Sequence, residues 1–334
     1  MADVMVFSPG PQLTVTIEAS ATGDQVHFHA GGQGVWQARM LTSLDIHVVL
    51  VAALGGEAGD VLRPLLQREG IQLRVLNTDV SNSVYVHDRR KGERQQLAEA
   101  PGEPLGRHEQ DELYGLALAE GLKADVSLLS GVVNPDVMPP DMYRRLAGDL
   151  RANHSVVVAD LSGDYLRAAV AGGLDVLKVS HEELVRHGVA ESDGVEQLVA
   201  AMRQLRSQGA RTVIVSRAER PALALFDDEV VQVELPELEP ADPRGAGDSM
   251  TAGVAAVLAN GGDIATAIRT GAAAGAANVT RRGLGTGCPE VIAALWERVK
   301  LTRVPHESGS SSSRQQRRPE HISPDELAER SKPS

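Results

Sequence analysis

The chain has 334 residues, of which 42% are hydrophobic and 3% aromatic, and it carries a formal net charge of −12. This negative balance repels nucleic-acid backbones and anionic lipid headgroups, so we expect no nucleic-acid partner and no membrane partner. The single cysteine excludes a disulfide within the chain and a zinc site built from cysteines. Because the sequence also shows no signal-peptide pattern and no apolar run long enough to cross a bilayer, we expect a cytoplasmic protein.

In chain order, short β-rich runs alternate with longer helical patterns. Several of the runs are unbroken apolar segments, which is typical of strands buried on both faces of a parallel sheet. The sequence therefore predicts an α/β fold with a doubly wound, mainly parallel sheet flanked by helices. The expected strands are residues 3–7, 47–54, 125–131, 155–163, 175–180 and 212–217, and the expected helices are residues 57–69, 107–122, 138–152, 193–208, 248–260 and 263–280.

Two pairs of segments in which apolar and polar residues alternate interrupt this order of strands and helices. Residues 14–19 and 25–30 flank a turn signal, as do residues 83–88 and 94–100. Hairpins inserted into an α/β core predict a small separate β-sheet that covers a cleft as a lid, from about residues 12–34 and 83–101.

The end of the chain differs in composition. Residues 1–303 carry the α/β pattern and predict one domain. Residues 304–334 are rich in Ser, Pro and charge and poor in apolar side chains, so we expect a disordered tail there.

A glycine cluster, "AGGQGVWQARM" at residues 30–40, follows the first hairpin and opens a helix. Glycines at 31, 32 and 34 allow a backbone to approach a ligand closely. A tight strand-to-helix turn without any ligand needs the same residues, and the pattern alone leaves both interpretations open.

A second cluster, "DPRGAGDSMTAG" at residues 242–253, also leads into a helix. Small residues at a helix start leave backbone N–H groups exposed, and the helix dipole makes that end an anion site. Asp248 beside such a site can act as a base that takes a proton from an attacking hydroxyl while the N–H groups hold the charge of a phosphoryl group. An acidic residue that merely complements the helix dipole is the alternative.

The order of these pieces resembles the PfkB, or ribokinase-like, family of sugar kinases. The resemblance is strongest to the branch that holds 1-phosphofructokinase, tagatose-6-phosphate kinase and the minor 6-phosphofructokinase. The matching segments are "GGQGVWQAR", "ALGGEAGDVLRPLLQREGI", "LLSGVVNPDVMPPDMYRRL", "VVADLSGDYL", "LKVSHEEL" and "DPRGAGDSMTAG".

The resemblance implies ATP-dependent phosphorylation of a hydroxyl on a sugar or sugar phosphate, with ATP and Mg²⁺ as cofactors. It implies Asp248 as the general base, the backbone amides of Gly245, Ala246 and Gly247 as the anion hole, and Glu183 as an acid that holds Mg²⁺ through water. For the nucleotide it implies Lys178, Ser180, Ser216, Gly247 and Gly283, and for the substrate Gln12, Gly31, Gly32, Gln33 and Gly34.

The departures from the family pattern are concentrated at the ligands. Gln12 and Gln33 stand where the family carries a sugar-binding Asp and a Lys, and Ser81-Asn82 replaces a Thr-Arg pair used on sugar phosphate. The nucleotide loop S-x-G-x-x-G reads "SRAERP" at residues 216–221. These changes leave open a catalytically weakened relative that binds a sugar or nucleotide, or a nucleoside kinase. The family also leaves open a homodimer that pairs through the small sheets.

Overall fold

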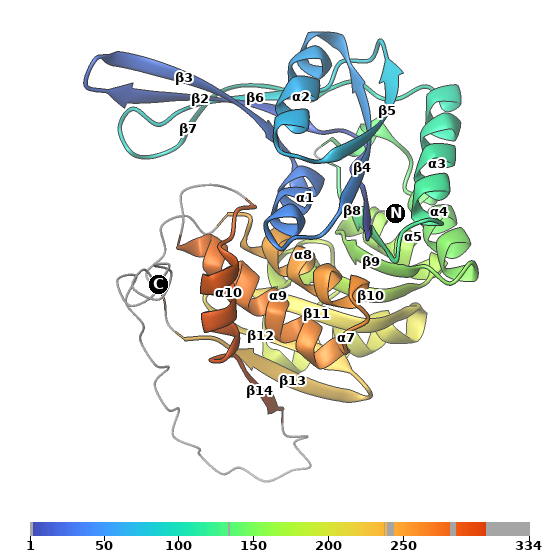
Figure 1. The fold of residues 1–334 in the computed structure, drawn as a ribbon. Coiled ribbons are helices and arrows are strands. Elements are labelled where there is room, and N and C mark those ends of the chain that lie inside the picture. The colour runs from blue at the N-terminus through green and yellow to red at the C-terminus, as the bar shows by residue number, and fades with distance from the viewer. Residues whose placement is uncertain (1–2, 133, 237, 239–243, 281–284, 305–334) are drawn as a thin grey trace.

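The structure is a computed structural model that describes residues 3–132, 134–236, 238, 244–280 and 285–304. A large sheet of ten strands runs in the order β14-β13-β12-β11-β10-β9-β8-β1-β4-β5 (Figure 1). The seven strands from β11 to β5 are parallel, and β12, β13 and β14 add antiparallel pairs at one edge. The strands are β1 (Val4–Phe7), β4 (Val48–Gly55), β5 (Gln72–Thr78), β8 (Val126–Ser130), β9 (Val156–Asp160), β10 (Leu174–Ser180), β11 (Ala210–Arg217), β12 (Arg220–Phe226), β13 (Glu229–Glu234) and β14 (Lys300–Arg303).

Helices cover both faces of this sheet, and each face has its own apolar core. One face packs α1 (Gln33–Ser43), α2 (Gly56–Arg68), α8 (Ala246–Ala259), α9 (Ile264–Val279) and α10 (Pro289–Trp296). The other packs α3 (Arg107–Gly121), α4 (Asp141–Ala152), α5 (Gly163–Gly172), α6 (His181–Arg186) and α7 (Val195–Gln208). A short 3-10 helix, η1 (Pro135–Val137), lies between β8 and α4.

A separate small sheet projects from this body (Figure 1). Its strands lie in the order β3-β2-β6-β7, with bounds β2 (Gln12–Ser20), β3 (Gly23–Gly31), β6 (Ser83–Asp88) and β7 (Gln95–Ala100). Because side chains alternate along a strand, the pairing gives the small sheet two different faces. The apolar face carries Val15, Ile17, Val26, Phe28 and Val86, and the polar face carries Thr14, Thr16, His27, His29, Tyr85 and His87.

The predicted fold class is confirmed, including the small separate sheet. The pattern missed β5, β12, β13 and β14, which lie at the two edges of the large sheet and expose part of their side chains, so they lack the continuous apolar run of the central strands. Helix α4 begins at Asp141 rather than at 138, because Pro139 and Pro140 precede it and each proline disfavours a helical conformation in the residue before it.

The expectations about membrane-spanning segments and about the tail can be compared only with the residues that the structure describes. Within that part of the chain, no helix is both long and apolar enough to span a bilayer. Apart from Val304, the expected tail at 304–334 lies outside the described residues.

Candidate active site

The start of α8, which we define as residues 244–248, forms the centre of the site. Gly245 is the N-cap residue and adopts a left-handed conformation with φ 74°, which glycine permits without strain. The first intrahelical bond runs from the Ser249 N–H to the Gly245 carbonyl, 2.8 Å. The N–H groups of Ala246, Gly247 and Asp248 precede that bond, so they fall among the first amides that a helix leaves without an internal acceptor. This end of α8 can therefore hold an anion.

Behind the α8 start lies a buried ion pair between neighbouring parallel strands. Asp160, the last residue of β9, is in register with Lys178 of β10, and the Lys178 Nζ atom lies 3.2 Å from both carboxylate oxygens. Thr251 of α8 donates a hydrogen bond to Asp160 at 2.7 Å, and Gln37 of α1 donates another at 3.3 Å. The pair therefore ties β9, β10, α1 and α8 together.

Lys178 also lies directly against the anion site. A Cβ atom added to Gly247 would come within 2.4 Å of the Lys178 Nζ atom, so the Gly247 backbone and the Lys178 ammonium group lie in close contact. Burial alone would lower the pKa of Lys178, but the negative charges of Asp160, Asp248 and Glu183 outweigh it and raise that pKa. Lys178 is therefore a stable cation beside the N–H groups that would hold a phosphoryl group.

Asp248 occupies the first turn of α8 and is only 9% exposed. Burial raises the pKa of Asp248 to about 7, and the negative charge of Asp160 adds to this effect. The positive charge of Lys178 and a hydrogen bond from the Gln33 side chain act in the opposite direction. A carboxyl group with a pKa near neutrality is suited to accept a proton from a hydroxyl group at working pH.

Glu183 and Ser180 hold each other at the start of α6. The Glu183 Oε2 atom accepts hydrogen bonds from the Ser180 backbone N–H, 2.9 Å, and from its hydroxyl, 2.7 Å, while Ser180 caps the Glu183 N–H. Within the described residues, no group of three or more His, Cys, Asp or Glu side chains could hold a metal ion. Magnesium is usually bound through one or two carboxylates together with substrate phosphates, so a lone Glu183 fits an ion that arrives with a nucleotide.

The glycine segment at the end of β3 reaches the same centre through Gln33. The Gln33 Oε1 atom accepts a hydrogen bond from the Gly131 N–H at 2.7 Å, and the Gln33 side-chain amide donates a hydrogen bond to the Asp248 carboxylate. Gly31 is in register with Gln12, which is 9% exposed, and Gly32 has a positive φ of 99° beside it. Gly34 lies close to β1, because an added Cβ would lie 2.4 Å from the Ser8 Cβ atom.

On the nucleotide side, Ser216 of β11 lies in register beside Ser180 of β10. The sequence after it makes a tight turn into β12, in which Ala218 takes a left-handed conformation with φ 52°. Gly283 lies outside the described residues. The structure therefore brings Asp248, Gly247, Lys178, Gln33 and Glu183 within electrostatic reach of one another, and places Ser180 and Ser216 on the adjoining strand ends.

Sequence reasoning missed residues that position this centre. Asp160 lies inside a segment that matched the family, but no role was assigned to it. Asn278 of α9 is 1% exposed; its amide donates to the Arg244 carbonyl at 2.7 Å and accepts from the Gly285 N–H at 3.0 Å. A buried Asn in an otherwise small and apolar helix was the available signal, since buried polar groups are normally paired.

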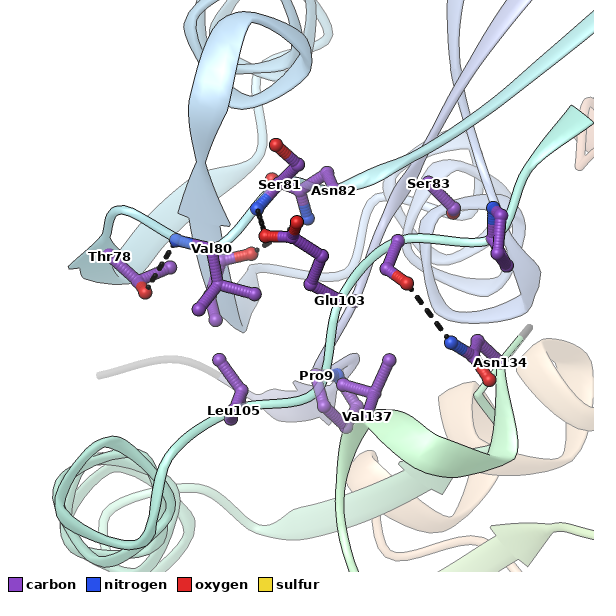
Figure 2. Close-up of a pocket in the computed structure, with 14 residues that line it drawn as sticks. Pro9, Thr78, Val80, Ser81, Asn82, Ser83, Glu103, Leu105, Asn134 and Val137 are labelled. Carbon is purple, nitrogen blue, oxygen red and sulfur yellow. Dashed lines mark hydrogen bonds between the residues drawn. The ribbon is translucent and has the colours of Figure 1, made fainter.

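A pocket lies near the base of the small sheet, and Figure 2 shows how its side chains converge. Within it, the Ser81 N–H donates to the Glu103 carboxylate at 3.2 Å, and the Asn134 amide donates to the Gly102 carbonyl at 3.2 Å (Figure 2). The residues that line it are Pro9, Gly10, Ala53, Thr78, Val80, Ser81, Asn82, Ser83, Pro101, Gly102, Glu103, Leu105, Asn134 and Val137.

Comparison with known proteins gives consistent results. The profile of the pfkB family of carbohydrate kinases matches residues 9–291. A 1-phosphofructokinase of Bacillus subtilis is 26% identical over 83% of this chain and 89% of that protein. A 1-phosphofructokinase of Haloferax volcanii is 29% identical over 80% and 88%, and the ATP-dependent 6-phosphofructokinase isozyme 2 of Escherichia coli is 27% identical over 77% and 83%.

Solved structures share the fold. The Escherichia coli phosphofructokinase-2 structure in complex with potassium superposes with a TM-score of 0.80 at 23% identity, covering 89% of this chain and 99% of that one. An Arabidopsis thaliana ribokinase complexed with ribose and ATP gives a TM-score of 0.67 at 19% identity, covering 89% and 99%. A further phosphofructokinase-2 structure from Escherichia coli is described as a tetrameric inhibited form, with a TM-score of 0.77 at 22% identity over 89% of this chain and 99% of that one.

Proposed function

The chain belongs to the pfkB family of carbohydrate kinases, and we propose that it transfers the γ-phosphoryl group of ATP to a hydroxyl of a sugar or sugar phosphate at the α8 start. The observation that carries this proposal is the position of Asp248, which is buried at a helix N-terminus and accepts a hydrogen bond from the Gln33 side chain. The Lys178 cation lies beside the same helix start. This pairing of a base with an anion site is what phosphoryl transfer to a hydroxyl requires.

In the proposed reaction, Asp248 accepts the proton of the acceptor hydroxyl while the oxygen of that hydroxyl forms a bond to the γ-phosphorus of ATP. The bond between the γ-phosphorus and the leaving ADP oxygen breaks. The backbone amides of Gly245, Ala246 and Gly247 hold the negative charge on the transferring group. Bound Mg²⁺, near Glu183, would neutralise charge on the nucleotide phosphates. We assign Lys178, Ser180, Ser216 and Gly283 to the nucleotide side, and Gln12, Gly31, Gly32, Gln33 and Gly34 to the acceptor side.

The direct test is an acceptor screen. Purified protein with Mg-ATP is incubated with hexoses, hexose phosphates and nucleosides, and ADP release is followed together with ATP binding. Turnover with a sugar or sugar phosphate supports the proposal. Turnover with nucleosides alone would instead identify a nucleoside kinase. Absence of both turnover and ATP binding would contradict the proposal.

The pH dependence of the reaction follows from Asp248. Because the pKa of Asp248 is raised to about 7 and its deprotonated form is the base, kcat/KM should rise with pH through about 7. At pH 6 about a tenth of the groups remain deprotonated, so the rate should fall to about a tenth of its plateau. A pH–rate profile checks this, and a flat profile between pH 5 and 8 would contradict Asp248 as the base.

We further propose a homodimer that packs the apolar faces of two small sheets together. On that face, Val26 and Phe28 are each 52% exposed and lie beside their partners Ile17 and Val15, so they form a contiguous apolar patch of the kind that marks an interaction surface. Phe28→Glu should shift the protein from dimer to monomer in sedimentation velocity experiments. Leu122→Glu, at a residue that is 48% exposed outside the small sheet, is the matched control and should leave the mass unchanged. A wild-type monomer at micromolar concentration would overturn this part of the proposal.

The remaining parts of the proposal concern organisation. We propose that residues 1–303 form one kinase domain, with the small sheet as a lid over the acceptor. We also propose a cytoplasmic location, because the reaction consumes ATP.

A further inference from the structure

Gln33, the first residue of α1, lies between the end of β8 and the base of the proposed reaction. Its Oε1 atom accepts a hydrogen bond from the Gly131 N–H at 2.7 Å, and its side-chain amide donates to the Asp248 carboxylate. The chain carries this glutamine where the family pattern has a lysine. A neutral donor therefore takes the place of a cation directly beside a buried carboxylate.

The contact with Gly131 fixes which end of the Gln33 amide faces Asp248. A glutamine amide has an acceptor oxygen at one end and a donor NH₂ group at the other, and its partners decide between the two orientations. A backbone N–H can only donate, so the Gln33 oxygen faces Gly131 and the NH₂ group faces Asp248. The NH₂ group can donate to a carboxylate but cannot accept from a protonated carboxyl group. The contact therefore favours the ionised form of Asp248.

A second glutamine, one turn further along α1, repeats this arrangement. Gln37 is fully buried; its Oε1 atom accepts a hydrogen bond from the Ser130 hydroxyl, and its amide donates to Asp160 at 3.3 Å. Ser130 is the last residue of β8 and Gly131 follows it, so the two glutamines bond the end of this strand side by side. Gln37 thereby anchors α1 one turn behind Gln33 and limits the movement of Gln33.

The charges around Asp248 explain why a neutral donor matters at this position. Burial raises the pKa of Asp248 to about 7, and the negative charges of Asp160 on β9 and Glu183 on α6 act in the same direction. Lys178 on β10 and the hydrogen bond from Gln33 lower that pKa. A second cation at position 33 would lower it further and leave a weaker base, whereas a side chain without a donor would leave most of the groups protonated at neutral pH.

We propose that Gln33 is a positioning residue, which holds Asp248 as an ionised base at neutral pH and thereby sets the pH range of the reaction. The inference rests on the proposed function, since it concerns the base of that same reaction. It gives Gln33 a role beyond its place on the acceptor side, and it assigns a physical consequence to one of the positions where this chain departs from the family pattern.

The test compares two substitutions that both remove the acceptor for the Gly131 N–H. Gln33→Met removes the donor to Asp248 without adding a charge, and Gln33→Lys replaces that donor with a cation. The midpoint of the Asp248 titration should rise by roughly one to two pH units in Gln33→Met, the usual size of a hydrogen bond to a charged group. It should fall by roughly one pH unit in Gln33→Lys. If Gln33 only supported the end of β8, the two variants would shift the midpoint in the same direction.

The midpoint is measured by ¹³C NMR of protein labelled at the aspartate carboxyl groups, in which Asp248→Asn identifies the signal of residue 248. The pH dependence of kcat/KM is recorded for the same variants, and its midpoint should move with the NMR midpoint. Thermal unfolding of each variant shows that the protein remains folded over the pH range.

Gln197→Met is the matched control, because Gln197 also lies in the first turn of a helix, α7, but on the opposite face of the large sheet, and it should leave both midpoints unchanged. The inference is overturned if Gln33→Met and Gln33→Lys leave the Asp248 midpoint where it is in the wild type, or move it in the same direction. Because the NMR titration needs no turnover, opposite shifts in a protein that phosphorylates no acceptor would refute only the proposed kinase reaction.

Discussion

Asp248→Asn is expected to lower kcat by about 10²-fold to 10⁴-fold, the usual contribution of a positioned general base. The amide has nearly the same shape as the carboxylate but cannot accept the proton of the acceptor hydroxyl. The backbone amides at the α8 start are unchanged by this substitution, so ATP should still bind. A coupled assay of ADP release gives kcat, and calorimetry gives the affinity for ATP.

Asp263→Asn provides the matched control for that substitution. Asp263 is also an aspartate at a helix start, where it accepts a hydrogen bond from the Thr266 N–H at 2.9 Å, but it caps α9 on the surface. Its replacement makes the same chemical change outside the site and should leave kcat unaltered. Near-normal turnover by Asp248→Asn, or an equal loss in both variants, would contradict Asp248 as the base.

The second large effect is expected at Lys178. Lys178→Met leaves the buried Asp160 without its ion-pair partner, and breaking a buried pair in this way typically lowers the free energy of unfolding by about 3–5 kcal/mol. The substitution also removes the cation that lowers the pKa of Asp248, so that pKa should rise further. Because the deprotonated carboxylate is the active form, the rise of kcat/KM should then move to higher pH. Urea unfolding and a pH–rate profile measure the two effects.

A second variant separates the two roles of Lys178. In Asp160→Asn/Lys178→Met both charges are removed, so no unpaired carboxylate remains buried at residue 160, and part of the lost stability should return. Activity of the double variant should nevertheless remain below that of the wild type, because no cation remains beside Gly247. If Lys178→Met unfolds at the same urea concentration as the wild type, the buried pair does not support the site as described.

The parts of the site that could be predicted from the sequence are those carried by contiguous residues. Glycines followed by Asp248 predict the start of α8, and unbroken apolar runs predict the central strands. The pairing of Asp160 with Lys178 could not be found this way, because it depends on β9 and β10 being neighbours in register. Asn278 and Arg244 likewise meet only through the packing of α9 against α8.

The altered nucleotide loop shows a different limit of sequence reasoning. In "SRAERP" the two glycines of the family's loop are replaced by Ala218 and Pro221. The structure forms a tight turn between β11 and β12, with Ala218 in the left-handed region at φ 52°. An alanine pays roughly 1–2 kcal/mol for that conformation, so the change in sequence is accommodated at a modest cost in stability.

The most direct measurement of the central claim is a ³¹P NMR time course of Mg-ATP with the hexose and hexose phosphate panel, recorded for the wild type and for Asp248→Asn. The account predicts that the wild type converts ATP to ADP with stoichiometric appearance of a new phosphate monoester on the acceptor, and that Asp248→Asn forms neither at a comparable rate. Monoester formation at equal rates by both proteins, or no monoester from the wild type with any sugar or sugar phosphate, would contradict it.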